Sequence, residues 1–250
     1  MNGLEGRARP SFRSSYGRLA AAQKTSVGVS FYSRWVNRPL GRVFAAGGHV
    51  AGLTPNHLTA MSAVFTLGGL VLIATVPPHP LTGVAAGVLL LLGFALDSSD
   101  GQLARLRGGG SLLGEWLDHI VDSAKTPLVH VAVLIAAWRF YAVDPSWLLV
   151  PLVFLVIAVV QFSGILLTPF LLQRGGRGQA ARTPSTVRSL ALLPADYGVI
   201  ATSFLLCGIP AVFVPTYTVL AGFSVVITGI MLAGWRRRLL AADSQSDAGA

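Results

Sequence analysis

Residues 97–122 read DSSDGQLARLRGGGSLLGEWLDHIVD and lie where two long apolar segments, 81–99 and 113–140, approach each other along the chain. Spacings of three and four residues place the aspartates of this stretch in two pairs, each on one face of a helix. The glycine run 108–110 between the pairs predicts a tight turn. We therefore expect two antiparallel helices that bring four carboxylates together: Asp97, Asp100, Asp118 and Asp122.

The composition is typical of an integral membrane protein. Hydrophobic residues make up 53% of the 250 residues, and the charged share of 12% is about half that of a typical soluble domain. Such a chain would not stay disordered in water. The net charge of +9 does not indicate a nucleic-acid partner, because the basic residues do not lie on a polar domain. The single cysteine, Cys207, excludes an intramolecular disulfide and a cysteine metal cluster.

Six apolar segments are each close to the roughly 20 residues that a helix needs to cross a bilayer. Sustained alternation of polar and apolar residues, which membrane strands require, is absent from the sequence. The predicted fold is therefore all-α and integral to the membrane. Its six transmembrane helices are expected at 57–76, 81–99, 113–140, 147–172, 192–210 and 214–234.

The amino-terminal region is basic and has no apolar run of signal-peptide length before Val50. We expect a flexible basic tail over 1–28, one membrane domain over 29–240 and a second flexible tail over 241–250. Aromatic and arginine residues mix within 29–47, which suits a juxtamembrane helix on the membrane surface, broken at Pro39. A solvated basic tail is the alternative for this segment.

The basic residues set the expected orientation. Of the 19 Lys and Arg residues, all except Lys125 and Arg139 lie in the terminal regions or in the connections on one side of the predicted spans. The positive-inside rule places this side, with both termini and the four aspartates, in the cytoplasm. The Arg-, Ala- and Gly-rich composition suggests a bacterium, so we expect a multi-pass protein of the bacterial inner membrane.

The aspartates need positive partners, because carboxylates near the hydrocarbon edge repel one another and are costly to take out of water. Arg105 and Lys125 offset part of this cost, and divalent cations offset it better. Oxygen ligands favour Mg²⁺ or Mn²⁺ over Zn²⁺, and four carboxylates suit two ions beside a phosphate substrate. Small residues near the acids leave a groove for such a substrate or, equally, allow close helix packing: Gly101, Ala104 and Gly114.

The complete pattern from 97 to 122 is Asp-x2-Asp-Gly-x2-Ala-Arg-x8-Gly-x3-Asp-x3-Asp. It resembles the signature of the CDP-alcohol phosphatidyltransferase family, with every spacing kept. The six-span topology extends the likeness to most of the chain, and Thr54-Pro55-Asn56 with Thr59 is similar to the usual lead-in of that family. Within the family the chain looks most like the bacterial phospholipid synthases that use CDP-diacylglycerol.

The resemblance implies a role for each residue of the motif. The metal-binding acids would be Asp97, Asp100, Asp118 and Asp122, with Asp122 also the catalytic general base. The CDP-alcohol would be bound at Gly101, Ala104, Arg105 and Gly114. The implied reaction is metal-dependent transfer of a substituted phosphate from a CDP-alcohol to an acceptor alcohol, with release of CMP, in phospholipid biosynthesis. The enzyme is expected to be a homodimer among membrane lipids.

Donor and acceptor stay open. We favour CDP-diacylglycerol as donor, because the basic loop 173–189 suits an anionic acceptor, with Arg188 as its candidate contact. Transfer of a small CDP-alcohol to a lipid acceptor is the alternative. Inositol phosphate, glycerol phosphate and serine are candidate acceptors. Phosphatidylinositol-phosphate synthases are similar in the glycine run, but the missing arginine between that run and Gly114 counts against them.

Two other classes of protein also place acids in membrane helices. A carrier would hold them near mid-membrane on broken helices, whereas here they lie at helix ends. Prenyltransferases use aspartate-rich helices without the Gly-x2-Ala-Arg element. Five further polar residues have plainer interpretations: His119 packs, Glu115 lies on the surface, His130 joins helices, Lys125 is a counter-charge for Asp122, and Asp196 caps a helix.

Overall fold

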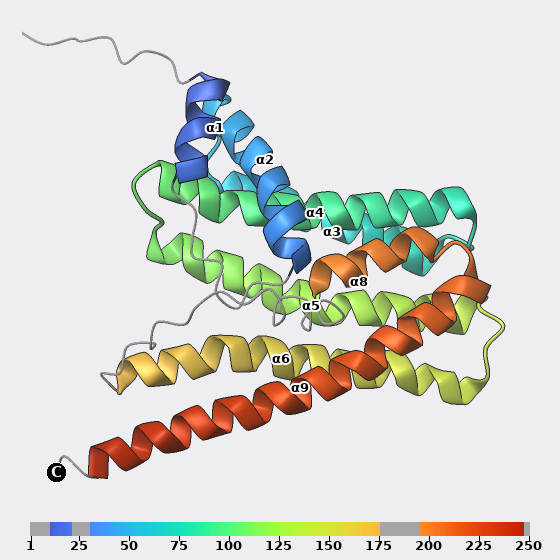
Figure 1. Cartoon of the computed structure of the whole chain (residues 1–250). Helices are drawn as coiled ribbons and strands as arrows, with labels where there is room; N and C mark the ends of the chain where they lie inside the picture. Colours follow the sequence, from blue (N-terminus) through green and yellow to red (C-terminus); the bar gives the residue numbers. More distant parts are fainter. Residues whose placement is uncertain (1–10, 22–30, 176–195, 248–250) are drawn as a thin grey trace, which may run out of the picture.

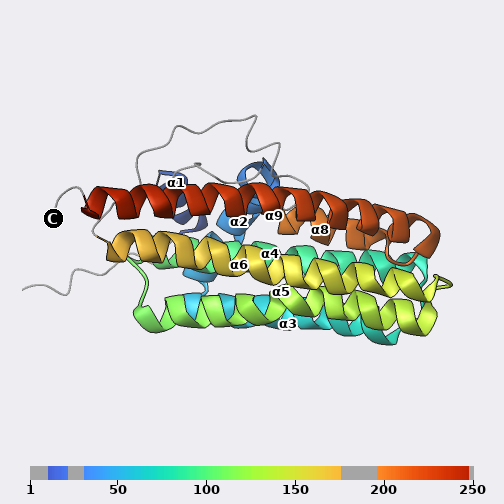
Figure 2. The same cartoon turned by 90° about the horizontal axis from the view of Figure 1, so that it is seen from below.

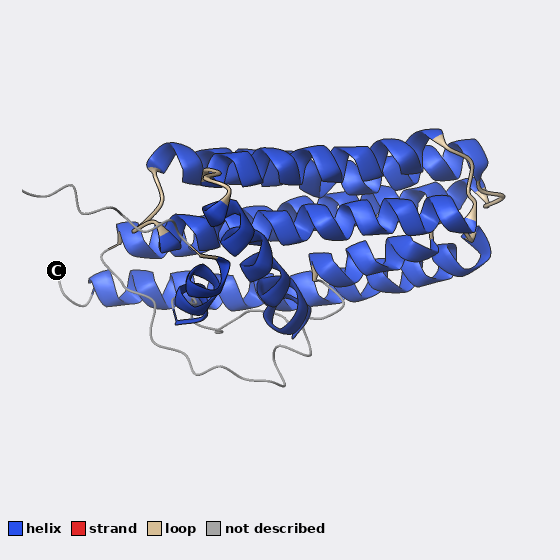
Figure 3. Cartoon of the chain, turned by 90° about the horizontal axis from the view of Figure 1, so that it is seen from above, coloured by secondary structure: helices blue, strands red, loops and turns tan. Residues whose placement is uncertain are grey.

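The computed structural model describes residues 11–21, 31–175 and 196–247, and these residues form helices and connections without strands (Figure 3). The long helices run roughly along one axis and pack side by side (Figures 1 and 2). They are α3 (Pro55–Thr75), α4 (Pro80–Leu106), α5 (Leu112–Phe140), α6 (Leu149–Arg174) and α9 (Pro210–Asp247).

Five segments of the described chain are long and apolar enough to cross a membrane, and they match the predicted spans one to four and six. The predicted fifth span, 192–210, is represented by α8 (Tyr197–Ser203) and the 3-10 turn η4 (Phe204–Leu206). These two elements together are shorter than a bilayer crossing requires, and residues 192–195 lie outside the described residues. The sixth transmembrane helix therefore stays a prediction.

The turn between α4 and α5 forms where the glycine run predicts it. Gly108 and Gly109 have φ angles of 97° and 133°, which side chains other than glycine rarely adopt. The Ser111 hydroxyl then caps α5 by accepting a hydrogen bond from the amide of Gly114 at 3.0 Å. Figure 1 shows this turn at the same end of the bundle as the final turns of α6 and α9.

The amino-terminal region differs from the prediction. Within the expected flexible tail, 1–28, the chain forms α1 (Phe12–Ala21), whose Leu19 is buried among side chains of α2, α3 and α4. Tyr16 of the same helix packs against this cluster. The helix α9 likewise continues to Asp247, within the second expected tail. The boundaries of the two tails and of the membrane domain stay predictions.

The expected break at Pro39 is absent. The π-helical turn η1 (Ser33–Asn37) leads directly into α2 (Arg38–Val50), and Pro39 occupies the first turn of α2. Tyr32, Asn37 and Arg38 all have right-handed helical dihedral angles, so the helical backbone continues from η1 through Pro39 although proline has no amide hydrogen to donate. The location of this helix on a membrane surface stays a prediction.

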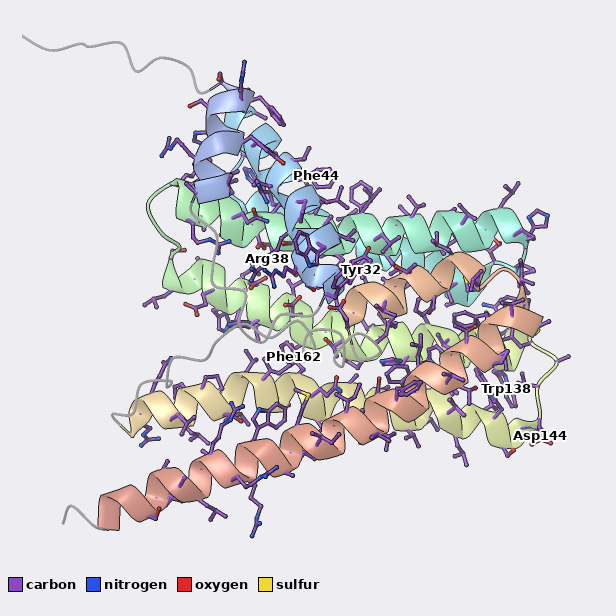
Figure 4. The ribbon with its side chains drawn as sticks, in the orientation of Figure 1. Tyr32, Arg38, Phe44, Trp138, Asp144 and Phe162 are labelled. Carbon is purple, nitrogen blue, oxygen red and sulfur yellow. The ribbon has the colours of Figure 1, made fainter. Side chains whose placement is uncertain are left out.

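Buried polar contacts join the helices. The Nδ1 atom of His130 on α5 lies 2.6 Å from the hydroxyl of Tyr217 on α9, which confirms the interhelical role predicted for His130. Asp196 caps α8 by accepting from the amide of Gly198 at 2.6 Å, also as predicted, and accepts from the Ser33 hydroxyl at 3.0 Å. Tyr32, labelled in Figure 4 beside α8, packs against Phe94 of α4. The segment before α2 is thus tied to both α4 and α8.

Gly41 sets the distance between α2 and the part of α4 that carries the motif. A Cβ atom at Gly41 would lie 2.8 Å from Gln102 Nε2 and 2.9 Å from Ser98 Oγ, both on α4. The side-chain amide of Gln102 also donates to the Arg38 carbonyl at 3.1 Å. The helix α2 is therefore docked on α4 by close backbone approach and a buried hydrogen bond.

We expect Gly41→Leu to destabilise the protein by about 1–3 kcal/mol, because the added side chain overpacks the contact between α2 and α4. Gly47→Leu on the same helix is the matched control, since a Cβ there meets no atom within 4 Å. Thermal unfolding in detergent measures both. Equal midpoints for the two variants would contradict the close docking of α2.

Candidate metal centre

Three of the four predicted acids converge between α4 and α5. One carboxylate oxygen from each of Asp97, Asp118 and Asp122 lies within 4.8 Å of the other two, and all three residues are half-buried. Asp97 comes from α4, and the other two are one turn apart on α5. The spacing argument therefore correctly predicts that the two helices bring these carboxylates together.

Asp100 lies one turn beyond Asp97 and is more deeply buried, with 6% of its surface exposed. Its carboxylate accepts a hydrogen bond of 2.5 Å from the Thr59 hydroxyl of α3 and another from the amide of Gly101. It lies outside the group of three carboxylates but within electrostatic range of Asp97 and Asp118. The hydroxyl of Thr59, a residue of the lead-in motif, thus orients the carboxylate of Asp100.

Lys125 stands among the acids. Its ammonium forms an ion pair with Asp97 and a second one, at 2.8 Å, with Asp122 Oδ1. It also donates to the Ser62 hydroxyl of α3 at 3.3 Å. The contact with Asp122 is the predicted one, and the contacts with Asp97 and Ser62 join α5 to α4 and α3.

The small residues border the acids in two different ways. Among the described residues, a Cβ at Gly101 would meet only the flexible end of Arg105, at 3.4 Å, so a side chain there would displace nothing rigid. A Cβ at Gly114 would approach Ser111 Oγ at 3.1 Å and Asn56 Oδ1 at 3.2 Å. Ala104 is half-buried. Gly101 therefore fits the predicted groove, whereas Gly114 lies against polar atoms at the start of α3 and α5.

Two arginines approach the site from different helices. Arg105 of α4 interacts electrostatically with Asp100 and is repelled by Arg38 of α2. Burial, followed by the charge of Arg34, lowers the pKa of Arg38. Figure 4 shows Arg38 where the first turn of α2 passes over α5 in that view. Arg38 thus adds positive charge near Arg105, and it was not predicted as a site residue from the sequence.

The remaining predicted residues are more distant from the chemistry or lie elsewhere. Glu115 is exposed, and His119 is half-buried and outside the group of three carboxylates, as predicted for both. Arg188, the predicted acceptor contact, lies outside the described residues. Trp138 and Asp144 mark the opposite end of the bundle (Figure 4).

The donor set fits a hard divalent cation. The converging atoms are carboxylate oxygens, the ligands that Mg²⁺ and Mn²⁺ prefer, and the group contains neither histidine nor cysteine. The position of the Lys125 ammonium shows that this cluster already attracts positive charge. A cluster of carboxylates between long apolar helices is therefore a candidate metal centre in a protein with the features of a membrane protein.

Comparison with known proteins places the chain within one family. A family model described as CDP-alcohol phosphatidyltransferase matches residues 52–235, which is most of the chain. The chain therefore belongs to the CDP-alcohol phosphatidyltransferase family, and the resemblance of the motif is confirmed.

Relatives with a known activity are similar over part of the chain. The archaetidylinositol phosphate synthase of Aeropyrum pernix is 30% identical over 161 residues, covering 60% of this chain and 75% of the relative. The phosphatidylinositol phosphate synthase of Corynebacterium glutamicum is 37% identical over 98 residues, covering 39% of this chain and 42% of the relative.

Solved structures share the fold. The crystal structure of Mycobacterium tuberculosis phosphatidylinositol phosphate synthase in complex with manganese and citrate has a TM-score of 0.51 and 22% identity, covering 77% of this chain and 87% of its own. The same enzyme with CDP-DAG bound has a TM-score of 0.52 and 21% identity, covering 80% and 93%.

Proposed function

We propose that the protein transfers the phosphatidyl group of CDP-diacylglycerol to an anionic alcohol, with inositol phosphate as the first candidate, and releases CMP. The observation that carries this proposal is the convergence of Asp97, Asp118 and Asp122 in a chain of this family. The relatives are archaetidylinositol phosphate and phosphatidylinositol phosphate synthases, which supports the acceptor, and the CDP-DAG-bound structure of a similar fold supports the donor.

The four acids would hold the metal. Asp97, Asp118 and Asp122 are already grouped, and Asp100 adjoins them with its carboxylate oriented by Thr59. We propose two ions, either Mg²⁺ or Mn²⁺, and the manganese in a structure of similar fold supports the choice. When bound, such ions neutralise the diphosphate and spread the negative charge that develops during phosphoryl transfer.

Asp122 is the proposed general base. Its carboxylate would accept the proton of the acceptor hydroxyl as that oxygen forms a bond to the phosphorus bearing the diacylglycerol. The bond between this phosphorus and the CMP oxygen breaks, and CMP takes the electron pair. The ion pair of 2.8 Å with Lys125 holds the Asp122 carboxylate in place on the face shared with Asp118.

The nucleotide would lie along α4. Gly101 would leave room for it, the small side chain of Ala104 would add little bulk beside it, and Arg105 would supply a guanidinium near Asp100 for phosphate oxygens. Gly114 would bind the CDP-alcohol only as the family resemblance implies, since it lies against Ser111 and Asn56. The helix α3 packs against both α4 and α5, and we propose that bound substrate keeps bulk water from the attacking position, which would favour transfer to an alcohol over hydrolysis.

An anionic acceptor needs positive charge on the cytoplasmic side of this site. Arg38 on α2 is the candidate within the described chain, and Arg188 is the candidate from the sequence. We further propose that the enzyme is a homodimer of the bacterial inner membrane, with its active site and both termini in the cytoplasm, as the distribution of basic residues favours.

The choice of substrates is tested with purified protein, labelled CDP-diacylglycerol, Mg²⁺ and a panel of acceptors. We expect inositol phosphate to give CMP and a phosphatidylinositol phosphate, with glycerol phosphate, serine and free inositol giving little. CMP release with a neutral acceptor alone would contradict the anionic acceptor. Product from a small CDP-alcohol and diacylglycerol, without reaction of CDP-diacylglycerol, would reverse the donor assignment.

Replacing the proposed base tests the catalytic role of Asp122. We expect Asp122→Asn to lower the rate of CMP release at least about a hundredfold, because the amide cannot accept the proton. Binding of labelled CDP-diacylglycerol should be largely kept. Glu115→Gln, which removes an exposed carboxylate from the same helix, is the control. Near-normal turnover of Asp122→Asn would exclude Asp122 as the base.

A further inference from the structure

Lys125 is a buried cation whose contacts reach three helices. Only 8% of its surface is exposed. Its ammonium contacts Asp97 on α4, Asp122 on its own helix and the Ser62 hydroxyl on α3. Ser62 in turn donates to the same Asp97 oxygen, Oδ1, at 3.4 Å. This arrangement satisfies the ammonium fully and fixes where it stands.

The two acids paired with Lys125 are also two of the three that form the candidate metal centre. The Lys125 ammonium and a bound divalent ion would therefore interact with the same two carboxylates. Each carboxylate has two oxygens, and Lys125 takes Oδ1 of Asp97 and Oδ1 of Asp122. A divalent ion bound by Asp97 and Asp122 would therefore lie near the Lys125 ammonium, which is already paired with the same two carboxylates.

We infer that Lys125 is a built-in counter-ion that competes with the metal, holding Asp97 and Asp122 together while the site is metal-free and weakening metal binding. This inference rests on the metal site of the proposed function. It assigns Lys125 a positioning role toward the ions and not a contact with the reacting atoms.

The physical argument compares the two states of the site. Without the metal, removing Lys125 would leave two neighbouring carboxylates unpaired within an apolar bundle, which is strongly unfavourable. With the metal bound, the Lys125 ammonium repels the metal ion, because both are positive and both contact Asp97 and Asp122. This repulsion is strong because the site is partly shielded from bulk water. Lys125 therefore stabilises the metal-free state more than the loaded state, and this difference must appear as reduced metal affinity.

A purely structural lysine would behave differently. If Lys125 only tied α3, α4 and α5 together, its loss would destabilise the metal-free and loaded protein to the same extent. Metal affinity would then stay unchanged or fall as the carboxylates moved apart. Metal affinity and stability measured together distinguish this role from competition.

The experiment uses the full chain in detergent, stripped of metal and titrated with Mn²⁺ while electron paramagnetic resonance counts the free ion. Lys125→Met removes the charge at similar size, and Lys125→Gln removes it while keeping a hydrogen-bond donor if the first variant does not fold. We expect both to bind Mn²⁺ about tenfold or more tighter than the wild type. Lys125→Arg keeps the charge and should stay within about threefold.

Thermal unfolding completes the test. Metal-free Lys125→Met should unfold at a lower temperature than the wild type, and Mn²⁺ should restore most of that loss. The control is Gln161→Leu, which breaks the 2.7 Å hydrogen bond to Thr228 between α6 and α9 and should lower stability without changing Mn²⁺ affinity.

Two failures are distinguishable. If the wild-type chain binds Mn²⁺ and neither neutral variant binds it more tightly, the competition is overturned while the proposed function stands. Equal losses of stability with and without Mn²⁺ would overturn it as well. If the wild-type chain binds no Mn²⁺ at all, both the proposed metal site and this inference are overturned.

Discussion

The gathering of acids inside an apolar helical bundle is the constraint on which the rest of the structure depends. Carboxylates so placed repel one another and lose water, so the fold must supply positive charge and hydrogen-bond donors around them. Lys125 pairs with two of the acids, and Thr59 donates to a third. The helices α3, α4 and α5 each contribute residues to this neutralisation and to the apolar core.

The proposed reaction places the same demand on the site. A CDP-linked lipid brings a diphosphate to a membrane-embedded site that already holds four carboxylates, so cations are needed between the two sets of negative charge. Gly101 and the guanidinium of Arg105 lie next to that charge boundary. Membership of the CDP-alcohol phosphatidyltransferase family and the local electrostatics thus independently support the proposed metal-dependent transfer.

Local spacing made much of the site predictable. The pairing of the aspartates, the turn at Gly108 and Gly109 and the cap at Asp196 follow from short-range rules of helix geometry. An interhelical contact of His130 could be predicted because a buried polar group needs a partner, but its partner Tyr217 could not. The pairing of Lys125 with Asp97 could not be predicted, because it depends on the relative rotation of α4 and α5. The approach of Arg38 depends in the same way on how α2 docks across α4.

The amino-terminal region shows where composition misleads. Its many arginines predict a solvated tail, yet Leu19 and Tyr16 dock α1 on α2, where Arg42 also covers the Tyr16 ring. Of the predicted fifth span, the described residues form α8 and η4, which ends at Leu206, and the span as a whole stays a prediction. For the amino-terminal region and for residues 192–210, the average hydropathy of a segment does not tell which individual side chains pack against other helices.

The central claim is that these acids hold a pair of divalent ions close together, and manganese spectroscopy tests it most directly. Two Mn²⁺ ions held about 3.5–4 Å apart by shared carboxylates are magnetically coupled, so their paramagnetic resonance spectrum differs from that of isolated ions. The account predicts two bound ions per chain with a coupled spectrum, lost in Asp97→Asn. Retention of a single isolated ion, or of none, by the folded wild-type chain would contradict it.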